Sequence, residues 1–207
     1  MKRPKSTPAP LTVVAGPNAT AVAPAYGVAV AGSDGKAIVS SFGVAYAGHH
    51  GSALGQPDNH GVVAVAGDNG MATTGDGGVA KVDAYGSASA PGNWGYAFAA
   101  TGGSAIAGYQ GAAATAGGTA QGGPECVAMA SFNNMPGIAQ AGPLGVAIAY
   151  DRCLVSGELG AILICYGLVG RQRVRVMETV GKNGIKPNVP YRLDANGKFV
   201  IAKRKKK

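Results

Sequence analysis

Small residues alternate with larger ones in short runs along most of the chain, and a new run begins about every eight residues. Examples are Gly27-Val-Ala-Val-Ala, Gly43-Val-Ala-Tyr-Ala, Gly95-Tyr-Ala-Phe-Ala and Gly145-Val-Ala-Ile-Ala. Alternation with a period of two over five residues predicts a short β-strand with two distinct faces, and the glycines between runs predict turns. The third and fifth positions of each run, which are nearly always alanine, valine or glycine, share one of these faces.

Alanine fills little space, so two sheets that face each other through alanines must lie close together. We therefore predict an all-β fold, a thin two-sheet parallel β-solenoid (β-roll) in which alternate runs belong to opposite sheets. With two strands per coil, residues 11–167 give about eight or nine coils, stacked about 4.8 Å apart into a rod about 40 Å long. Collagen requires glycine at every third residue, a period that this chain lacks. Disorder is also disfavoured, because 46% of the residues are hydrophobic and 14% are charged.

The variable positions of the runs point away from the core and differ between the two sheets. They are mainly aliphatic or aromatic on one sheet, whereas the other sheet mixes serine, threonine, glutamine and lysine with apolar residues. Exposed valines can simply be good strand formers, but a contiguous apolar strip of this length is typical of a contact surface. We expect this sheet to be covered by identical copies, with a homotrimer as the first guess, or by the C-terminal segment. The expected interface residues are Val44, Tyr46, Tyr96, Phe98, Val127, Met129, Val146 and Ile148.

The net charge of +8 is unevenly distributed along the chain. Residues 10–160 contain three Lys or Arg against eight Asp or Glu, whereas residues 161–207 contain twelve Lys or Arg against two acidic residues. An acidic rod with basic ends predicts that any contact with nucleic acid or another polyanion occurs at those ends. The candidate polyanion-binding residues are Arg171, Arg173, Arg175, Lys203, Arg204 and Lys205.

The repeat stops after Gly167, and the remaining pattern predicts a different structure. Residues 171–180 alternate over a longer stretch than any run of the repeat, and Asn-Gly pairs at 183–184 and 196–197 predict turns. We expect antiparallel strands over 168–202 that cap the open end of the solenoid. The other expected segments are a flexible basic N-terminus at 1–10 and a basic tail at 203–207.

Cysteine and histidine give little indication of chemistry. Cys126 and Cys153 replace glycine at the start of a run and Cys165 lies in an apolar run, so we expect three small buried thiols in a reducing compartment. His49-His50 and His60 are expected at opposite edges of the roll. We therefore expect no metal site, although neighbouring coils would bring aspartates near His49. No nucleophile with a partner base and no phosphate-binding loop of the Walker type occurs, so we expect no cofactor and no enzymatic activity.

Residues 1–10 lack the apolar core of a secretory signal, and no glycine-free run of 18 apolar residues occurs. We therefore expect the protein to be cytoplasmic or associated with a virion, without a signal peptide.

The Gly-x-Ala-x-Ala coil resembles the left-handed β-roll of trimeric autotransporter adhesin heads, in which three thin rolls pack side by side. The whole chain is more similar to uncharacterised phage and bacterial proteins built of Gly-Ala-Ala-Ser-Ala-Thr-Gly-type octads, which end in a segment like residues 184–200. This resemblance implies the fold and no functional residues. The expected function is a non-catalytic structural or binding module, a self-associating rod such as a phage particle or fibre component. One alternative is an intracellular phage-type protein that binds or sequesters a host factor, and a second is polyanion binding through the basic termini.

Overall fold

The protein is described here from a computed structural model that covers residues 11–56, 60–131 and 135–202. In this part of the chain it is all-β, with strands in two sheets of eleven. The first, sheet A, has the spatial order β1 (Thr12–Ala15), β3 (Val28–Ala31), β5 (Val44–Ala47), β7 (Val63–Ala66), β9 (Val79–Val82), β11 (Tyr96–Thr101), β13 (Ala112–Ala116), β15 (Val127–Ser131), β17 (Val146–Tyr150), β19 (Ile162–Val169) and β20 (Gln172–Thr179). The second, sheet B, has the order β2 (Thr20–Ala23), β4 (Lys36–Val39), β6 (Ser52–Gly55), β8 (Met71–Thr73), β10 (Ser87–Ala90), β12 (Ser104–Ala107), β14 (Thr119–Gly122), β16 (Ile138–Ala141), β18 (Leu154–Gly157), β21 (Tyr191–Leu193) and β22 (Phe199–Ile201).

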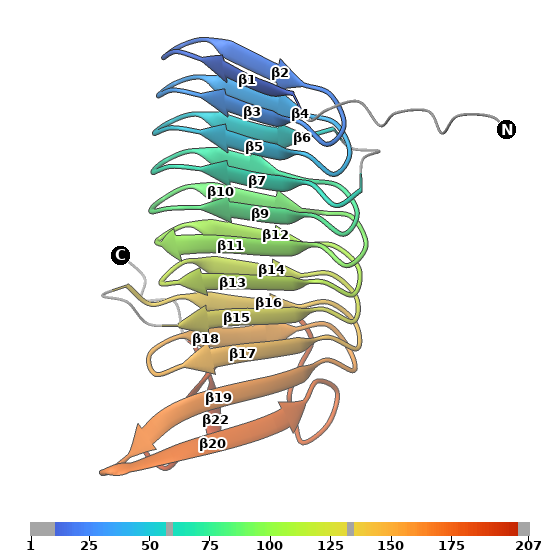
Figure 1. Ribbon diagram of the computed structural model, residues 1–207. Helices are drawn as coiled ribbons and strands as arrows, with labels where there is room; N and C mark the ends of the chain where they lie inside the picture. Colours follow the sequence, from blue (N-terminus) through green and yellow to red (C-terminus); the bar gives the residue numbers. More distant parts are fainter. Residues whose placement is uncertain (1–10, 57–59, 132–134, 203–207) are drawn as a thin grey trace, which may run out of the picture.

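Strands β1 to β18 form about nine coils, each containing one strand from each sheet (Figure 1). Each strand from β1 to β17 pairs in parallel with the strand two places further along the chain, so that Val28 of β3 lies beside Val44 of β5. The predicted parallel β-solenoid is therefore confirmed. No helix in the described part of the chain is long and apolar enough to cross a bilayer.

The chain changes sheet at turns that line the two edges of the rod. Most turns contain one residue with φ near +55°, just before the next strand run. Asn18 and Asp34 tolerate this conformation because their short polar side chains can bond locally. Several bulky residues with exposed side chains also adopt this left-handed conformation: Tyr26, Phe42, Tyr85, Trp94 and Leu144.

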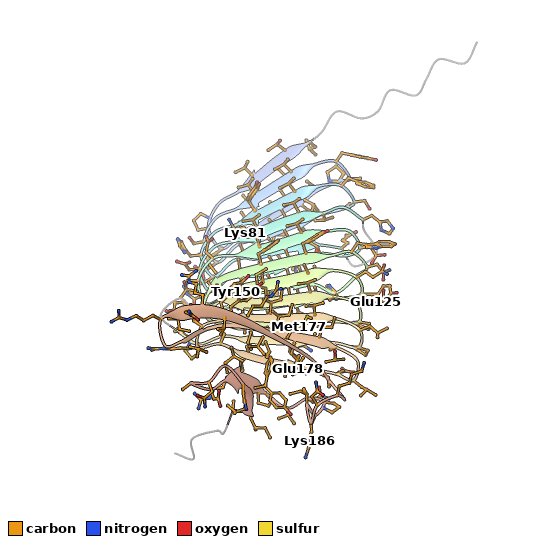
Figure 2. All side chains as sticks on the ribbon, turned by 90° about the horizontal axis from the view of Figure 1, so that it is seen from below. Lys81, Glu125, Tyr150, Met177, Glu178 and Lys186 are labelled. Atoms are coloured by element: carbon orange, nitrogen blue, oxygen red, sulfur yellow. The ribbon has the colours of Figure 1, made fainter. Side chains whose placement is uncertain are left out.

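Contacts between successive turns continue the sheet ladders around the edges. The Tyr26 amide donates to the Ser41 carbonyl at 3.0 Å, and the Tyr26 and Phe42 rings stack with their centroids 5.4 Å apart. On the same edge, the Glu125 carboxylate accepts hydrogen bonds from Tyr109 Oη at 3.1 Å and Gln110 Nε2 at 2.7 Å. Figure 2 shows Glu125 at this edge, with Tyr150 towards the other.

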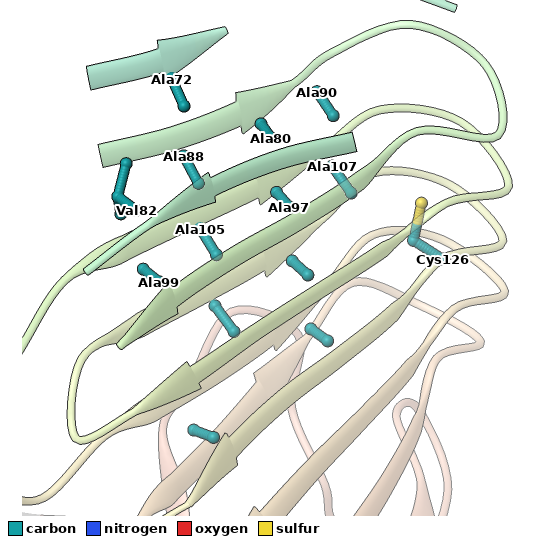
Figure 3. Close-up of a cluster of buried hydrophobic side chains, with 14 of the residues drawn as sticks. Ala72, Ala80, Val82, Ala88, Ala90, Ala97, Ala99, Ala105, Ala107 and Cys126 are labelled. Carbon is teal, nitrogen blue, oxygen red and sulfur yellow. The ribbon is translucent and has the colours of Figure 1, made fainter. Parts of the chain in front are cut away.

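Alanine fills the space between the sheets, as the sequence predicts. Ala97, Ala105 and Ala147 have no exposed surface, and Figure 3 shows Ala97 and Ala105 pointing into the space between the sheets. Because each contributes only a methyl group, the two sheets can approach closely along the whole rod.

Larger side chains enter this core where a glycine faces them. A Cβ atom added to Gly55 would lie 2.8 Å from Val62 Cγ1, and one added to Gly157 would lie 3.2 Å from Leu163 Cδ2. Both Val62 and Leu163 are fully buried. A large residue on one sheet is thus matched by the absence of a side chain on the other, so the sheets need not separate.

Antiparallel strands close the C-terminal end of both sheets. In sheet A, β20 pairs antiparallel with β19, so that Thr179 lies beside Ile162 and Gln172 lies beside Val169. In sheet B, β21 and β22 form an antiparallel pair beside β18. The side chain of Tyr191, the first residue of β21, is buried, and its hydroxyl accepts a hydrogen bond from the Lys186 amide at 2.8 Å. At the other end, β1 and β2 have a neighbouring strand on one side only within the described residues.

Candidate interaction surface

The outward side of sheet A carries two columns of side chains that follow the rod across nine strands, β3 to β19; we call these columns the apolar face. Strand pairing brings one residue of each column directly beside the next. Lys81 is the one charged residue in them. The first column is Val28, Val44, Val63, Val79, Tyr96, Ala112, Val127, Val146 and Ile162, and the second is Val30, Tyr46, Val65, Lys81, Phe98, Ala114, Met129, Ile148 and Ile164.

All eight residues expected at an interface from the sequence lie in the apolar face. Tyr46, Tyr96, Phe98 and Val127 are exposed, and their four companions are half-buried by neighbouring strands. The face also contains residues that were not predicted from the sequence, among them Val63 and Val65 of β7. The ten-residue spacing between Gly51 and Gly61 obscured them, although the alternation Val63-Ala-Val-Ala was a sufficient signal.

One depression interrupts the apolar face near its middle. Ala114 of β13 lies between Phe98 of β11 and Met129 of β15, and its short side chain leaves a hollow of about 280 Å³ between them. Lys81 and Ala116 also line this hollow. The face therefore has a ridge of two aromatic rings, Tyr96 and Phe98, beside a row of alanines.

The outward side of sheet B has a different composition. Serines 52, 87 and 104, Thr119, Gln121 and Gln140 occupy its outward positions. Apolar residues such as Ile106 and Ile138, each 37% exposed, lie among these polar groups. Sheet B therefore presents no continuous apolar strip, and it provides a natural internal comparison for sheet A.

Of the residues predicted to bind polyanions, Arg171, Arg173 and Arg175 lie on the C-terminal hairpin of sheet A. Arg173 and Arg175 are exposed on β20, and Arg171 is in the turn between β19 and β20. Arg173 and Arg175 line a cleft of about 390 Å³ together with Tyr150 and Tyr166. The structure thus brings two of the three arginines to one cleft. Lys203, Arg204 and Lys205 lie outside the described residues.

The two tyrosines of this cleft stack on each other, with ring centroids 4.7 Å apart and planes 6° from parallel. Arg175 is the cross-strand neighbour of Tyr166, so the outward column at this edge runs Tyr150, Tyr166, Arg175. Asp151 also lines the cleft and contributes a negative charge. Flat rings beside guanidinium groups are a suitable surface for anionic, aromatic ligands.

The histidines lie on opposite edges of the rod, as expected. His49 Nδ1 is 3.6 Å from Asp68 Oδ2, and His60 Nδ1 is 3.8 Å from Asp76 Oδ2. The side chains of both pairs are largely exposed, so neither pair contributes much to stability. Among the described residues, no group of three or more His, Cys, Asp or Glu side chains could hold a metal ion.

The three cysteines are buried free thiols. Cys126 Sγ accepts a hydrogen bond from the Gly111 amide at 3.0 Å and donates to the Gly108 carbonyl. Burial raises the pKa of the Cys165 thiol to about 12 and also raises the pKa of Cys153. At neutral pH these two thiols are therefore protonated and poor nucleophiles.

No protein-family model, curated protein or solved structure matches this chain. Function is therefore inferred from the surfaces of the molecule itself. Among those surfaces, the apolar face is a strip across nine strands with Lys81 as its one charged residue.

Proposed function

We propose that this protein is a non-catalytic structural module, a rod that associates with copies of itself through the apolar face of sheet A. The observation that supports this proposal is the continuity of the two outward columns across nine strands, with Lys81 as their one charged residue. Lysine, serine, threonine and glutamine interrupt the corresponding columns on sheet B. The asymmetry between the two sheets favours an arrangement in which one sheet is covered and the other faces solvent.

The size of the apolar face also favours a contact surface. Nine strands about 4.8 Å apart and four residues wide give a strip about 43 Å by about 13 Å, or about 560 Å². This area lies at the upper end of the largest apolar patches that monomers expose, roughly 300–600 Å². Two such strips in contact would bury about 1,100 Å², which exceeds the roughly 1,000 Å² expected of a specific interface.

A matched pair of substitutions tests the proposal. Val127 and Ile138 lie on consecutive strands, point outward from sheets A and B respectively, and are 36% and 37% exposed. We expect Val127→Glu to dissociate the oligomer, because the apolar contact would strip the carboxylate of its hydration. Ile138→Glu should leave it intact.

Sedimentation equilibrium across a range of protein concentrations measures the association, and circular dichroism checks that both variants keep the fold. An unsubstituted protein that stays monomeric at the highest concentration would overturn the proposal. Equal effects of the two glutamates would show that sheet A is not the contact surface.

A second candidate function is polyanion binding at the C-terminal hairpin. The cleft lined by the stacked tyrosines, Arg173 and Arg175 favours this function. Stacked aromatic rings and arginines together suit single-stranded nucleic acid. Fluorescence anisotropy with a labelled oligonucleotide should show salt-sensitive binding that the double substitution Arg173→Ala and Arg175→Ala weakens. Arg192→Ala, an exposed arginine on β21 of sheet B, is the control and should have little effect. Binding that is equally strong in all three proteins would exclude the cleft.

A further inference from the structure

The apolar face has a shape that distinguishes between the ways in which two copies can meet. Tyr96 and Phe98 stand out from β11 and are 47% and 42% exposed. Their direct neighbours on β13 are Ala112 and Ala114, whose side chains end at Cβ. Each ring therefore has a vacant position beside it, one strand spacing along the rod.

A parallel arrangement of two rods fits this shape poorly. If both rods point the same way, each strand lies opposite its own copy. The rings of Tyr96 and Phe98 would then meet the same rings of the partner, while the two alanine rows would face each other across a gap. Lys81, one strand before the rings, would also approach its own copy, and like charges in a poorly hydrated contact repel strongly.

An antiparallel arrangement removes these conflicts. A two-fold axis along the strand direction, between β11 and β13, places Phe98 opposite the partner's Ala114 and Tyr96 opposite the partner's Ala112. Such an isologous contact makes every favourable insertion twice. The two copies of Lys81 are then offset by three strand spacings, about 14 Å, which exceeds the Debye length at physiological salt.

We propose that two copies pair face to face with their rods antiparallel, each inserting Phe98 into the hollow beside the partner's Ala114 and placing Tyr96 over the partner's Ala112. This inference rests on the proposed self-association and specifies its partner, number and register. The hollow of about 280 Å³ beside Phe98 and Met129 is the receiving site.

The same axis brings residues of similar size together along the rest of the face. Strand β7 lies opposite the partner's β17, so Val65 faces the partner's Ile148. Strand β5 lies opposite the partner's β19, so Tyr46 faces the partner's Ile164. The aliphatic stem of Lys81 covers the partner's Met129, and its ammonium group can extend past the strip to water.

Crosslinking between different variants tests the register. Val65→Cys and Ile148→Cys leave the aromatic ridge and the hollow unchanged. Treated with a short bis-maleimide, a mixture of these two variants should give a covalent dimer, whereas each variant alone should give little. The buried native cysteines should remain unlabelled. Crosslinking of a single variant with itself and no gain on mixing would overturn the antiparallel register.

Moving the ridge by one strand gives a second test. Ala114→Phe fills the hollow and should raise the dimer Kd at least about fivefold, since overpacking of this kind costs roughly 1–3 kcal/mol and each 1.4 kcal/mol is about tenfold in Kd. Adding Phe98→Ala moves the ridge to β13 and the hollow to β11, and the two-fold axis makes the pair complementary again. The double variant should therefore recover dimerisation. Gln121→Phe on β14 of sheet B is the control and should have no effect.

The two proposals can fail separately. If the unsubstituted protein is monomeric, self-association itself is wrong. If it associates in a manner sensitive to Val127→Glu but neither mixed crosslinking nor the recovery by Phe98→Ala is seen, only the antiparallel pairing is wrong. A mass corresponding to three copies would likewise contradict the antiparallel pairing and leave self-association standing.

Discussion

Replacing Ala105 with leucine should strongly destabilise the solenoid. Ala105 has no exposed surface and lies between Ala88 and Ala120 of the neighbouring strands, with its methyl group directed at sheet A. Leucine extends about 2.5 Å beyond Cβ, as two further bonds require. In the same coil, a Cβ added to Gly103 would come within 2.7 Å of Ala99 Cβ on β11, so a gap fitted to a methyl group cannot accept this extension.

The expected cost follows from the lack of room for rearrangement. Overpacking usually costs about 1–3 kcal/mol, because neighbouring side chains shift to make space. Alanine neighbours have no side-chain rotamers with which to shift, so the sheets themselves must separate, and we expect at least about 3 kcal/mol. For a protein of this size that corresponds to a fall in melting temperature of about 6–12 °C. By contrast, the native Leu163 fits because Gly157 faces it.

Thermal and urea unfolding followed by circular dichroism measure this change. Ser104→Leu is the matched control, because Ser104 precedes Ala105 on β12 and points outward. It should change the free energy of unfolding by no more than about 0.5 kcal/mol, as is usual for surface positions. If the Ala105→Leu variant unfolds like the unsubstituted protein while the Ser104→Leu variant is destabilised, the inward and outward faces have been assigned the wrong way round.

Three further predictions concern the core and the turns. Gly55→Ala should cost about 1–3 kcal/mol through its contact with Val62, and adding Val62→Ala should recover part of that loss; strict additivity in urea unfolding would contradict the pairing. Because burial raises the pKa of Cys165 to about 12 from an ordinary value of 9.0, the unfolded thiol ionises first, and stability should fall above pH 9 by up to about 1.4 kcal/mol per pH unit. Between pH 8 and 10.5, the melting temperature of Cys165→Ala should decline less steeply than that of the unsubstituted protein. An equal slope in the two proteins would exclude this thiol as a source of the pH dependence. Trp94 has φ of 53° and is 59% exposed. Asparagine tolerates this backbone conformation better, so Trp94→Asn should keep the stability or raise it by up to about 1 kcal/mol. A clear fall in melting temperature would show that packing of the indole stabilises the turn.

The alternating pattern was sufficient to predict the solenoid and the direction of most side chains. Glycine and alanine recur at fixed positions because each coil has the same narrow core, so Ala97 and Ala147 could be assigned inward from the sequence alone. The antiparallel pair formed by residues 191–193 and 199–201 was predicted from its Asn-Gly turn, and the structure contains it.

Features that depend on how neighbouring coils align could not be predicted in the same way. The match between Gly55 and Val62 depends on the length of the intervening turn, which varies from coil to coil. The tyrosine stack depends on both strands continuing past the usual four residues, β17 to Tyr150 and β19 to Val169, so that Tyr150 lies beside Tyr166. The hollow at Ala114 arises from the contrast with its neighbours on adjacent strands, and no single run reveals that contrast.

The parallel pairing of each coil with the next has a consequence for how the chain folds. In the regular coils a residue pairs with one about sixteen positions away, as Thr12 does with Val28 and Lys36 does with Ser52. Relative to the length of the chain this separation is about 0.08, a contact order typical of helical bundles that fold in microseconds to milliseconds, whereas β-sandwiches have values of about 0.16–0.22. Each coil can therefore form as soon as the following one leaves the ribosome. The rod should grow in step with its own synthesis, without waiting for its C-terminal strands.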